Sequence, residues 1–137
     1  MTPHPPPLRR AQLDALLAFL PIFAQPGYIF GEWHADPGVL PFWSQSPEVA
    51  EFIQVLYHQQ FLITFDWVTW AAEAQRYDED GGAALATADL DTLRKLMTAS
   101  VRADRFSEGT LAARFQSGQI TAILRRLQQI RETMAAT

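Results

Sequence analysis

The chain has 137 residues, with eleven basic and fifteen acidic side chains, a formal net charge of −4 at pH 7 and no cysteine. The absence of cysteine excludes disulfides, thiol catalysis and thiolate zinc sites, and it fits a reducing compartment such as the cytoplasm. The acidic balance argues against general binding to nucleic acid or to an anionic membrane, and no run approaches the roughly 20 apolar residues of a membrane-spanning helix.

The N-terminal part predicts a tail followed by a first helix. Residues 1–8 are rich in proline and lack apolar periodicity, which is typical of a disordered tail, so we expect a single helical domain over residues 9–137. From Arg9 onward four leucines follow helical spacing, and Pro21 ends the pattern because the residue before a proline leaves helical backbone. These leucines are Leu13, Leu16, Leu17 and Leu20.

An aromatic-rich insertion follows between residues 25 and 44, where glycines and prolines interrupt the sequence. The segment Asp36-Pro37-Gly38 predicts a turn, since proline fixes the first corner and glycine accepts the positive φ of the second. Residues 28–34 and 39–43 are then candidates for the two strands of a β-hairpin. Because the prolines remove hydrogen-bond donors, we expect any hairpin here to be small.

The second and third helices have recognisable beginnings. Ser46 supplies a capping hydroxyl and Pro47 suits the first helical position, so the second helix is predicted to begin there. After an apolar extended segment at residues 61–65, Asp66 is expected to cap the third helix. The predicted apolar stripes are Val49, Phe52, Ile53 and Leu56 in the second helix, and Trp67, Trp70, Ala71 and Ala74 in the third.

Three more helices are predicted after an acidic connection at residues 78–82. Thr87 is expected to open the fourth helix, Ser107 to cap a short fifth, and Gly118 to end the fifth in left-handed backbone. The whole pattern predicts a mainly α fold, a compact bundle of about six helices with an irregular insertion that has room for a small β-hairpin. The stripes are Leu90, Leu93, Met97 and Val101, then Leu111 and Phe115, then Ile120, Ile123, Leu124, Leu127 and Ile130.

The densest charged cluster lies between the fourth and fifth predicted helices, at Arg102, Asp104, Arg105 and Glu108. One interpretation is a structural corner, in which Ser107 and Glu108 stabilise the start of the fifth helix. The other is an anion site, in which the two arginines hold a phosphate or carboxylate while an acid positions them. The spacing of these residues along the sequence does not decide between the two.

Two further groups combine acidic and aromatic side chains. Glu32, Trp33 and His34 lie in the insertion, where the histidine is a candidate acid or base because it titrates near neutral pH. Too few ligands converge there for a metal, so no metal site is predicted. Asp66 and Trp67 are either a helix cap and a core tryptophan or, if Asp66 faces Arg105 across a cleft, part of a buried ion pair.

Recognised catalytic and cofactor motifs are missing from the chain. There is no G-x-S-x-G elbow, Walker loop, G-x-G-x-x-G, H-E-x-x-H or calcium loop, so no cofactor is predicted and catalysis stays undecided. A nucleic-acid site would need Arg114, Arg125 and Arg126 to form one exposed stripe.

Six segments carry a family resemblance that covers nearly the whole chain after the tail. They are F-G-E-W-H at residues 30–34, S-P-E-V-A-E-F-I-Q-V-L-Y at 46–57, F-D-W at 65–67, A-D-L-D-T-L-R-K-L at 88–96, R-A-D-R-F-S-E-G at 102–109 and I-L-R-R-L at 123–127. With these segments the chain resembles a bacterial family known only as a domain of unknown function. The resemblance implies a small stand-alone bacterial protein of the cytoplasm, and it transfers no activity, cofactor, partner or catalytic residue.

The residues therefore favour a non-catalytic binding or protein-interaction domain, with a homodimer or another protein as partner. Its site is expected where the insertion meets the charged cluster at residues 102–108. The alternative is a small hydrolase or transferase that binds an anionic substrate through Arg102 and Arg105, with Glu32, His34 or Asp104 as acid or base.

Overall fold

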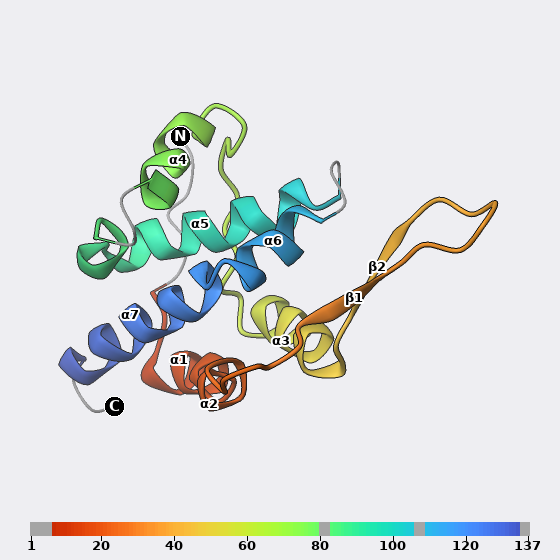
Figure 1. Cartoon of the computed structure of the whole chain (residues 1–137). Helices are drawn as coiled ribbons and strands as arrows, with labels where there is room; N and C mark the ends of the chain where they lie inside the picture. The colour runs from red at the N-terminus through yellow and green to blue at the C-terminus, as the bar shows by residue number, and fades with distance from the viewer. Residues whose placement is uncertain (1–6, 80–82, 106–108, 135–137) are drawn as a thin grey trace.

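The computed structural model describes residues 7–79, 83–105 and 109–134, and it shows a bundle of helices from which a β-hairpin projects (Figure 1). Six helices of seven residues or more lie in these ranges, so the mainly α fold with a small hairpin is confirmed. The elements are α1 (Arg10–Leu17), α2 (Leu20–Phe23), β1 (Gly31–His34), β2 (Phe42–Gln45), α3 (Pro47–His58), α4 (Ala71–Glu79), the 3₁₀ helix η1 (Leu85–Thr87), α5 (Leu90–Ala103), α6 (Thr110–Gln116) and α7 (Gln119–Thr133).

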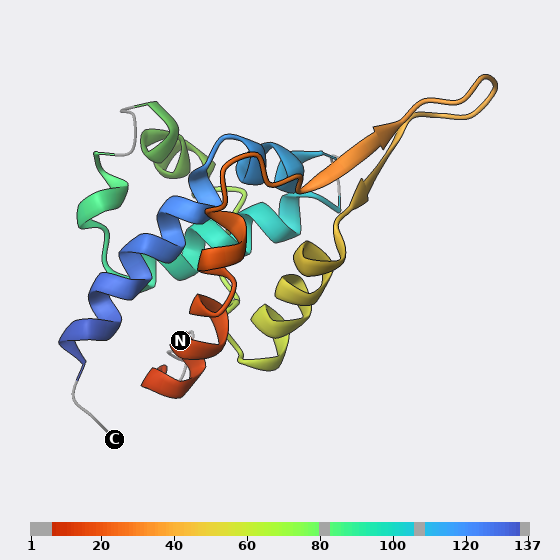
Figure 2. The same cartoon turned by 60° about the horizontal axis from the view of Figure 1, so that its bottom comes forward.

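The predicted apolar stripes, apart from the one at residues 67–74, form one core around α7. This helix contacts α1, α2, α5, α6 and η1, and α3 closes the core against α1 (Figure 2). Burying a large apolar side chain contributes roughly 1.5–3 kcal/mol, so this core is the main source of stability. Among its fully buried residues are Leu13, Leu16, Phe52, Leu56, Leu93, Met97, Phe115, Ile120, Ile123, Leu124 and Leu127. From the predicted stripes, Leu17, Ile53, Leu90 and Ile130 are only partly buried at its edge.

The N-terminal helix differs from the prediction. The first helix ends at Leu17, and Pro21 lies inside the short helix α2 instead of ending a helix. A proline is tolerated there because the first-turn N–H groups of a helix have no partner within the helix. Leu8, which the sequence analysis placed in the tail, is 7% exposed and belongs to the core. Residues 1–6 of that expected tail lie outside the described residues.

The helix boundaries were partly predicted. Ser46 caps α3 by accepting a hydrogen bond from the Val49 N–H at 3.2 Å, and Gly118 has the left-handed backbone expected between α6 and α7. The cap of α5 is Asp89, whose carboxylate accepts the Thr92 N–H at 2.8 Å, and not Thr87, which lies in η1. The Thr92 hydrogen bonds lower the pKa of Asp89. Ser107, the expected cap of α6, lies outside the described residues.

The third predicted helix begins later than expected. Asp66 accepts hydrogen bonds from the Thr69 N–H and hydroxyl at 3.2 and 2.6 Å, and these bonds lower the pKa of its carboxyl. They close a turn over residues 67–70, and α4 starts only at Ala71. Trp67 and Trp70 therefore precede the helix.

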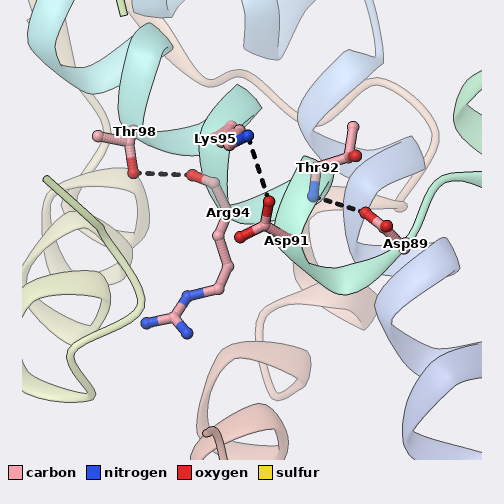
Figure 3. A network of polar contacts seen from close by, with 6 residues as sticks. All are labelled: Asp89, Asp91, Thr92, Arg94, Lys95 and Thr98. Carbon is pink, nitrogen blue, oxygen red and sulfur yellow. Dashed lines mark hydrogen bonds and ion pairs between the residues drawn. The ribbon is translucent and has the colours of Figure 1, made fainter. Parts of the chain in front are cut away.

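A buried arginine joins α5 to the end of α3. Arg94 is 4% exposed, and its guanidinium donates to the backbone carbonyls of Phe61 at 3.0 Å and Gln60 at 2.9 Å. Figure 3 shows it on α5 beside Thr98, whose hydroxyl donates to the Arg94 carbonyl at 2.7 Å. Burial lowers the pKa of Arg94, and the nearby Asp91 carboxylate opposes this effect. The sequence analysis did not identify this contact.

The hairpin has the predicted turn but different strand boundaries. The Val39 N–H donates to the Asp36 carbonyl at 3.1 Å, and Gly38 has a φ of +80°, as a type II turn requires at its third residue. The strands occupy residues 31–34 and 42–45 instead of 28–34 and 39–43. Pro41 has no N–H to donate, which favours the later start of β2. In the register, Trp33 pairs with Trp43 and His34 with Phe42.

Candidate functional site

The arm, which we define as residues 31–45, carries exposed apolar side chains away from the helices. In both views it projects from the bundle (Figures 1 and 2). Leu40 is 86% exposed and Val39 is 57% exposed, and Trp33 and Phe42 are exposed as well. These are four of the seven large apolar residues that are exposed in the described part of the chain. Exposed apolar side chains gathered on one element mark an interaction surface more often than isolated ones do.

The root of the arm is fastened to the core. The Tyr28 hydroxyl and the Ser46 hydroxyl are 2.8 Å apart, and the Ser46 N–H donates to the Phe30 carbonyl at 2.8 Å. The Phe30 ring lies 5.7 Å from the Phe23 ring and 5.3 Å from the Phe115 ring. The two strands therefore leave the bundle from a fixed base.

Aromatic pairs on both faces stiffen the arm. On one face the Trp33 and Trp43 rings meet edge to face at 5.6 Å, and on the other the His34 ring stacks on Phe42 at 4.8 Å. A Cβ atom at Gly31 would lie 2.5 Å from the Trp43 ring, so a glycine is required there. Cross-strand aromatic pairs of this kind stabilise a two-stranded hairpin, which alone is marginal in water.

The charged cluster forms a structural corner at Asp104. Its carboxylate Oδ1 accepts the N–H groups of Gly109 at 3.1 Å and Leu111 at 3.2 Å. These are donors of the first turn of α6, so Asp104 serves as the cap that the sequence analysis assigned to Ser107. Glu108 lies outside the described residues. A Cβ atom at Gly109 would lie 3.0 Å from the Trp33 ring, so the arm also rests against this corner.

Arg102 and Arg105 meet at one tyrosine of α3. The Arg102 guanidinium lies 5.8 Å from the centre of the Tyr57 ring, and Arg105 donates a hydrogen bond to the Tyr57 hydroxyl at 3.1 Å. Tyr57 and Arg105 are both exposed. The two guanidinium groups therefore both contact this one tyrosine.

A groove of about 400 Å³ runs between α4, α5 and α6. Trp67 forms one of its walls, and most of its other apolar lining consists of alanine side chains. Its volume lies at the lower end of the roughly 300–1,000 Å³ of ligand pockets. The complete lining is Trp67, Ala71, Ala74, Gln75, Leu96, Ala99, Ser100, Ala103, Thr110, Arg114 and Gln119.

Those candidate residues that the structure describes do not converge on one cleft. Glu32, Trp33 and His34 lie on the arm, and Arg102 and Arg105 lie at Tyr57. Asp66 is exposed and bonded to Thr69, so it does not form the buried ion pair with Arg105 that the sequence analysis considered.

The arginines considered for nucleic acid also lie apart. Arg114 lines the groove, whereas Arg125 and Arg126 line another depression, where Arg126 donates to the Ala88 carbonyl at 2.8 Å. Among the described residues no three His, Asp or Glu side chains gather as metal ligands. None of the helices in these ranges combines the length and apolar character needed to cross a membrane.

Two features were not predicted from the sequence, namely the exposed apolar loop between the strands of the arm and the alanine-lined groove. Val39 and Leu40 were assigned to a strand, where apolar side chains need no further explanation. Their position between Gly38 and Pro41 was the available signal, because that stretch cannot pair along its whole length. Ala99 and Ala103 are four residues apart on α5, which places them on one face, but small side chains indicate close helix packing equally well.

A model of one protein family, described as a family of unknown function, matches residues 8–133. The comparisons with curated proteins and with solved structures found no match.

Proposed function

The chain belongs to DUF6508, a family of unknown function, and we propose from its geometry that it is a non-catalytic protein-interaction domain that binds its partner through the arm. The supporting observation is that the loop between β1 and β2 projects from the helices (Figure 1) and that Val39 and Leu40 in this loop are exposed. Apolar surface in water costs about 25 cal/mol per Å², and a partner that covers it recovers this free energy. The exposed aromatic residues Trp33 and Phe42 are of the types enriched at protein interfaces.

We place this activity in the cytoplasm. The support is chemical, since a chain without cysteine forms none of the disulfides that stabilise many secreted proteins. Fractionation of cells that produce the protein tests this location.

Site-specific photo-crosslinking tests the arm as the binding element. Benzoylphenylalanine replaces Leu40 in one variant and Gln128, an exposed residue of α7, in a control variant. After irradiation of cells that produce the protein, we expect covalent adducts with protein at position 40 and none at position 128. Adducts that are equally frequent at both positions, or absent at position 40, would contradict a role of the arm in binding.

A second candidate function, binding of an anionic substrate, is favoured by the meeting of Arg102 and Arg105 at Tyr57. Two guanidinium groups that contact one tyrosine form a suitable receptor for a phosphate or carboxylate. The proposed catalytic acids have less support, because Asp104 is engaged as a cap and Glu32 lies on the arm. Titration with inorganic phosphate, followed by NMR shifts of the Arg102 and Arg105 side chains, tests the binding step. Binding that persists in Arg105→Gln would contradict it.

A further inference from the structure

We infer that the arm binds a second copy of this chain, with the tip at residues 35–42 of each copy seated in the groove between α4, α5 and α6 of the other. The inference rests on the proposed function, because it names the partner of the arm. Both halves of the contact are present on one chain, and their chemistry is complementary.

The tip supplies the inserted group. Leu40 is almost fully exposed, and its neighbours Val39, Pro41 and Phe42 are exposed as well. Asp36 is the one charged residue of the tip. No residue of the tip belongs to the hydrophobic core or packs against it, so the tip gains stability only when another surface covers it.

The groove supplies the matching receptor. Its lining includes the small side chains of four alanines, among them Ala99 and Ala103, together with the large side chain of Trp67. A cavity of about 400 Å³ has room for several aliphatic side chains, such as those at the tip. Arg114 is the charged residue among the described residues that line it, and its charge is opposite to that of Asp36 at the tip.

The direction of the arm makes the contact intermolecular. In Figures 1 and 2 the tip points away from the helices, whereas the groove lies on the bundle itself, so an arm does not reach the groove of its own chain. Two copies related by a twofold axis exchange arms and fill both grooves. Such an isologous contact forms a closed dimer, in which the tip and the groove of both chains are covered.

Sedimentation velocity of the full chain, at up to about 100 μM, tests the inference with one variant of each half. Leu40→Ser removes the apolar tip, and Ala71→Glu places a carboxylate at the groove, at an exposed first-turn position of α4 that tolerates an acid. We expect the wild type to form a dimer. The dissociation constant of each variant dimer should be higher than that of the wild type by about tenfold or more. The matched controls Ile29→Ser, exposed outside the arm, and Ala72→Glu, exposed beside the groove, leave the dimer intact.

Mixing the two variants distinguishes this contact from other dimers. The Leu40→Ser chain has an intact groove and the Ala71→Glu chain has an intact arm, so the mixture regains one arm-in-groove contact. We expect heterodimers in the mixture at a concentration where neither variant dimerises alone. A dimer formed by pairing the free edges of two arms would be sensitive to Leu40→Ser but not to Ala71→Glu, and that result would overturn the inference.

The outcome for self-association is separate from the outcome for the proposed function. A wild-type chain that stays monomeric, while position 40 still crosslinks to a different protein, overturns the second copy as partner and leaves the interaction function standing. Crosslinks from position 40 that join two copies through peptides containing Trp67 or Ala71 support both.

Discussion

At the scale of single residues, Arg94 shows how a charge contributes to stability inside this core. Apolar spacing marks Leu93 and Met97 as buried but assigns an arginine to the outer face, so the sequence did not predict its burial. Its partners are carbonyl groups about thirty residues earlier in the chain. Only the tertiary packing of α5 against the end of α3 brings them within reach.

Replacing this side chain should be costly. Arg94→Met removes two charge-assisted hydrogen bonds and leaves the carbonyls of Gln60 and Phe61 without this donor. We expect a loss of about 3 kcal/mol in the free energy of unfolding, measured by urea denaturation. The control Arg76→Met removes an exposed ion pair with Glu73 and should cost about 0.5 kcal/mol or less. Equal losses in both variants would contradict the structural role of Arg94.

A glycine at the left-handed residue after the cap of α3 should stabilise the fold. Gln60 has a φ of +56°, and the N–H groups of Gln60 and Phe61 donate to the Tyr57 and Leu56 carbonyls, the Schellman pattern at a helix end. Gln60→Gly should raise the free energy of unfolding by about 0.5–1 kcal/mol, because glycine adopts left-handed backbone without steric cost. The same change at Gln59, which has a negative φ, should lower it. Calorimetry of both variants measures the opposite signs.

At the scale of elements, the sequence predicted contacts between residues that are close in the chain. It did not predict contacts between residues that are far apart in the chain. Ser46 and Gly118 act at the helix ends next to them, and the sequence identified both. Thr87 and Asp89 can both cap a helix, and spacing did not decide between them. The cap of α6 comes from Asp104, across a corner that the sequence interpreted as either structure or anion site. That choice depends on where the backbone N–H groups point.

The capping role of Asp104 predicts a stability effect. Asp104→Ala removes the acceptor for the Gly109 and Leu111 N–H groups, and we expect a loss of about 1 kcal/mol. Hydrogen exchange should increase at the first turn of α6 more than in the other helices. The matched control Glu51→Ala, at an exposed position of α3, should leave both quantities nearly unchanged. A variant with native exchange in α6 would contradict the cap.

The ion pair between α1 and α7 predicts a pH dependence. Arg131 donates to both carboxylate oxygens of Asp14 at 2.7 and 3.2 Å, and these hydrogen bonds lower the pKa of Asp14 in the folded state. A lowered folded-state pKa contributes stability above the unfolded pKa of about 3.9, and this contribution is lost as the pH falls through the folded value. The difference in urea midpoint between wild type and Asp14→Asn should therefore shrink below about pH 4. A difference that grows on acidification would contradict this sign.

At the scale of the whole molecule, the sequence predicted the fold class and the presence of a hairpin but not their arrangement. Periodicity reports which side of a helix is buried, and four of the five residues in the predicted stripe of α7 are fully buried. It does not report that the hairpin leaves the bundle or that α4, α5 and α6 enclose a groove, because both depend on how separate elements pack. The candidate site was therefore predicted near its base, where Trp33 meets Gly109, and missed at its tip.

The separation of arm and core predicts that the tip can be removed without unfolding the helices. Replacing residues 35–41 with Asn-Gly joins His34 to Phe42 through a two-residue loop suited to a hairpin. The removed side chains are all exposed, and none belongs to the core, so the free energy of unfolding should change by about 0.5 kcal/mol or less. Thermal unfolding should be compared at a concentration where both proteins are monomeric, because association with a partner stabilises the native state by mass action. At higher concentration the shortened chain should fail to associate while the wild type dimerises. A large loss of monomer stability would instead mean that the tip supports the fold, and the case for the arm as a binding element would fall with it.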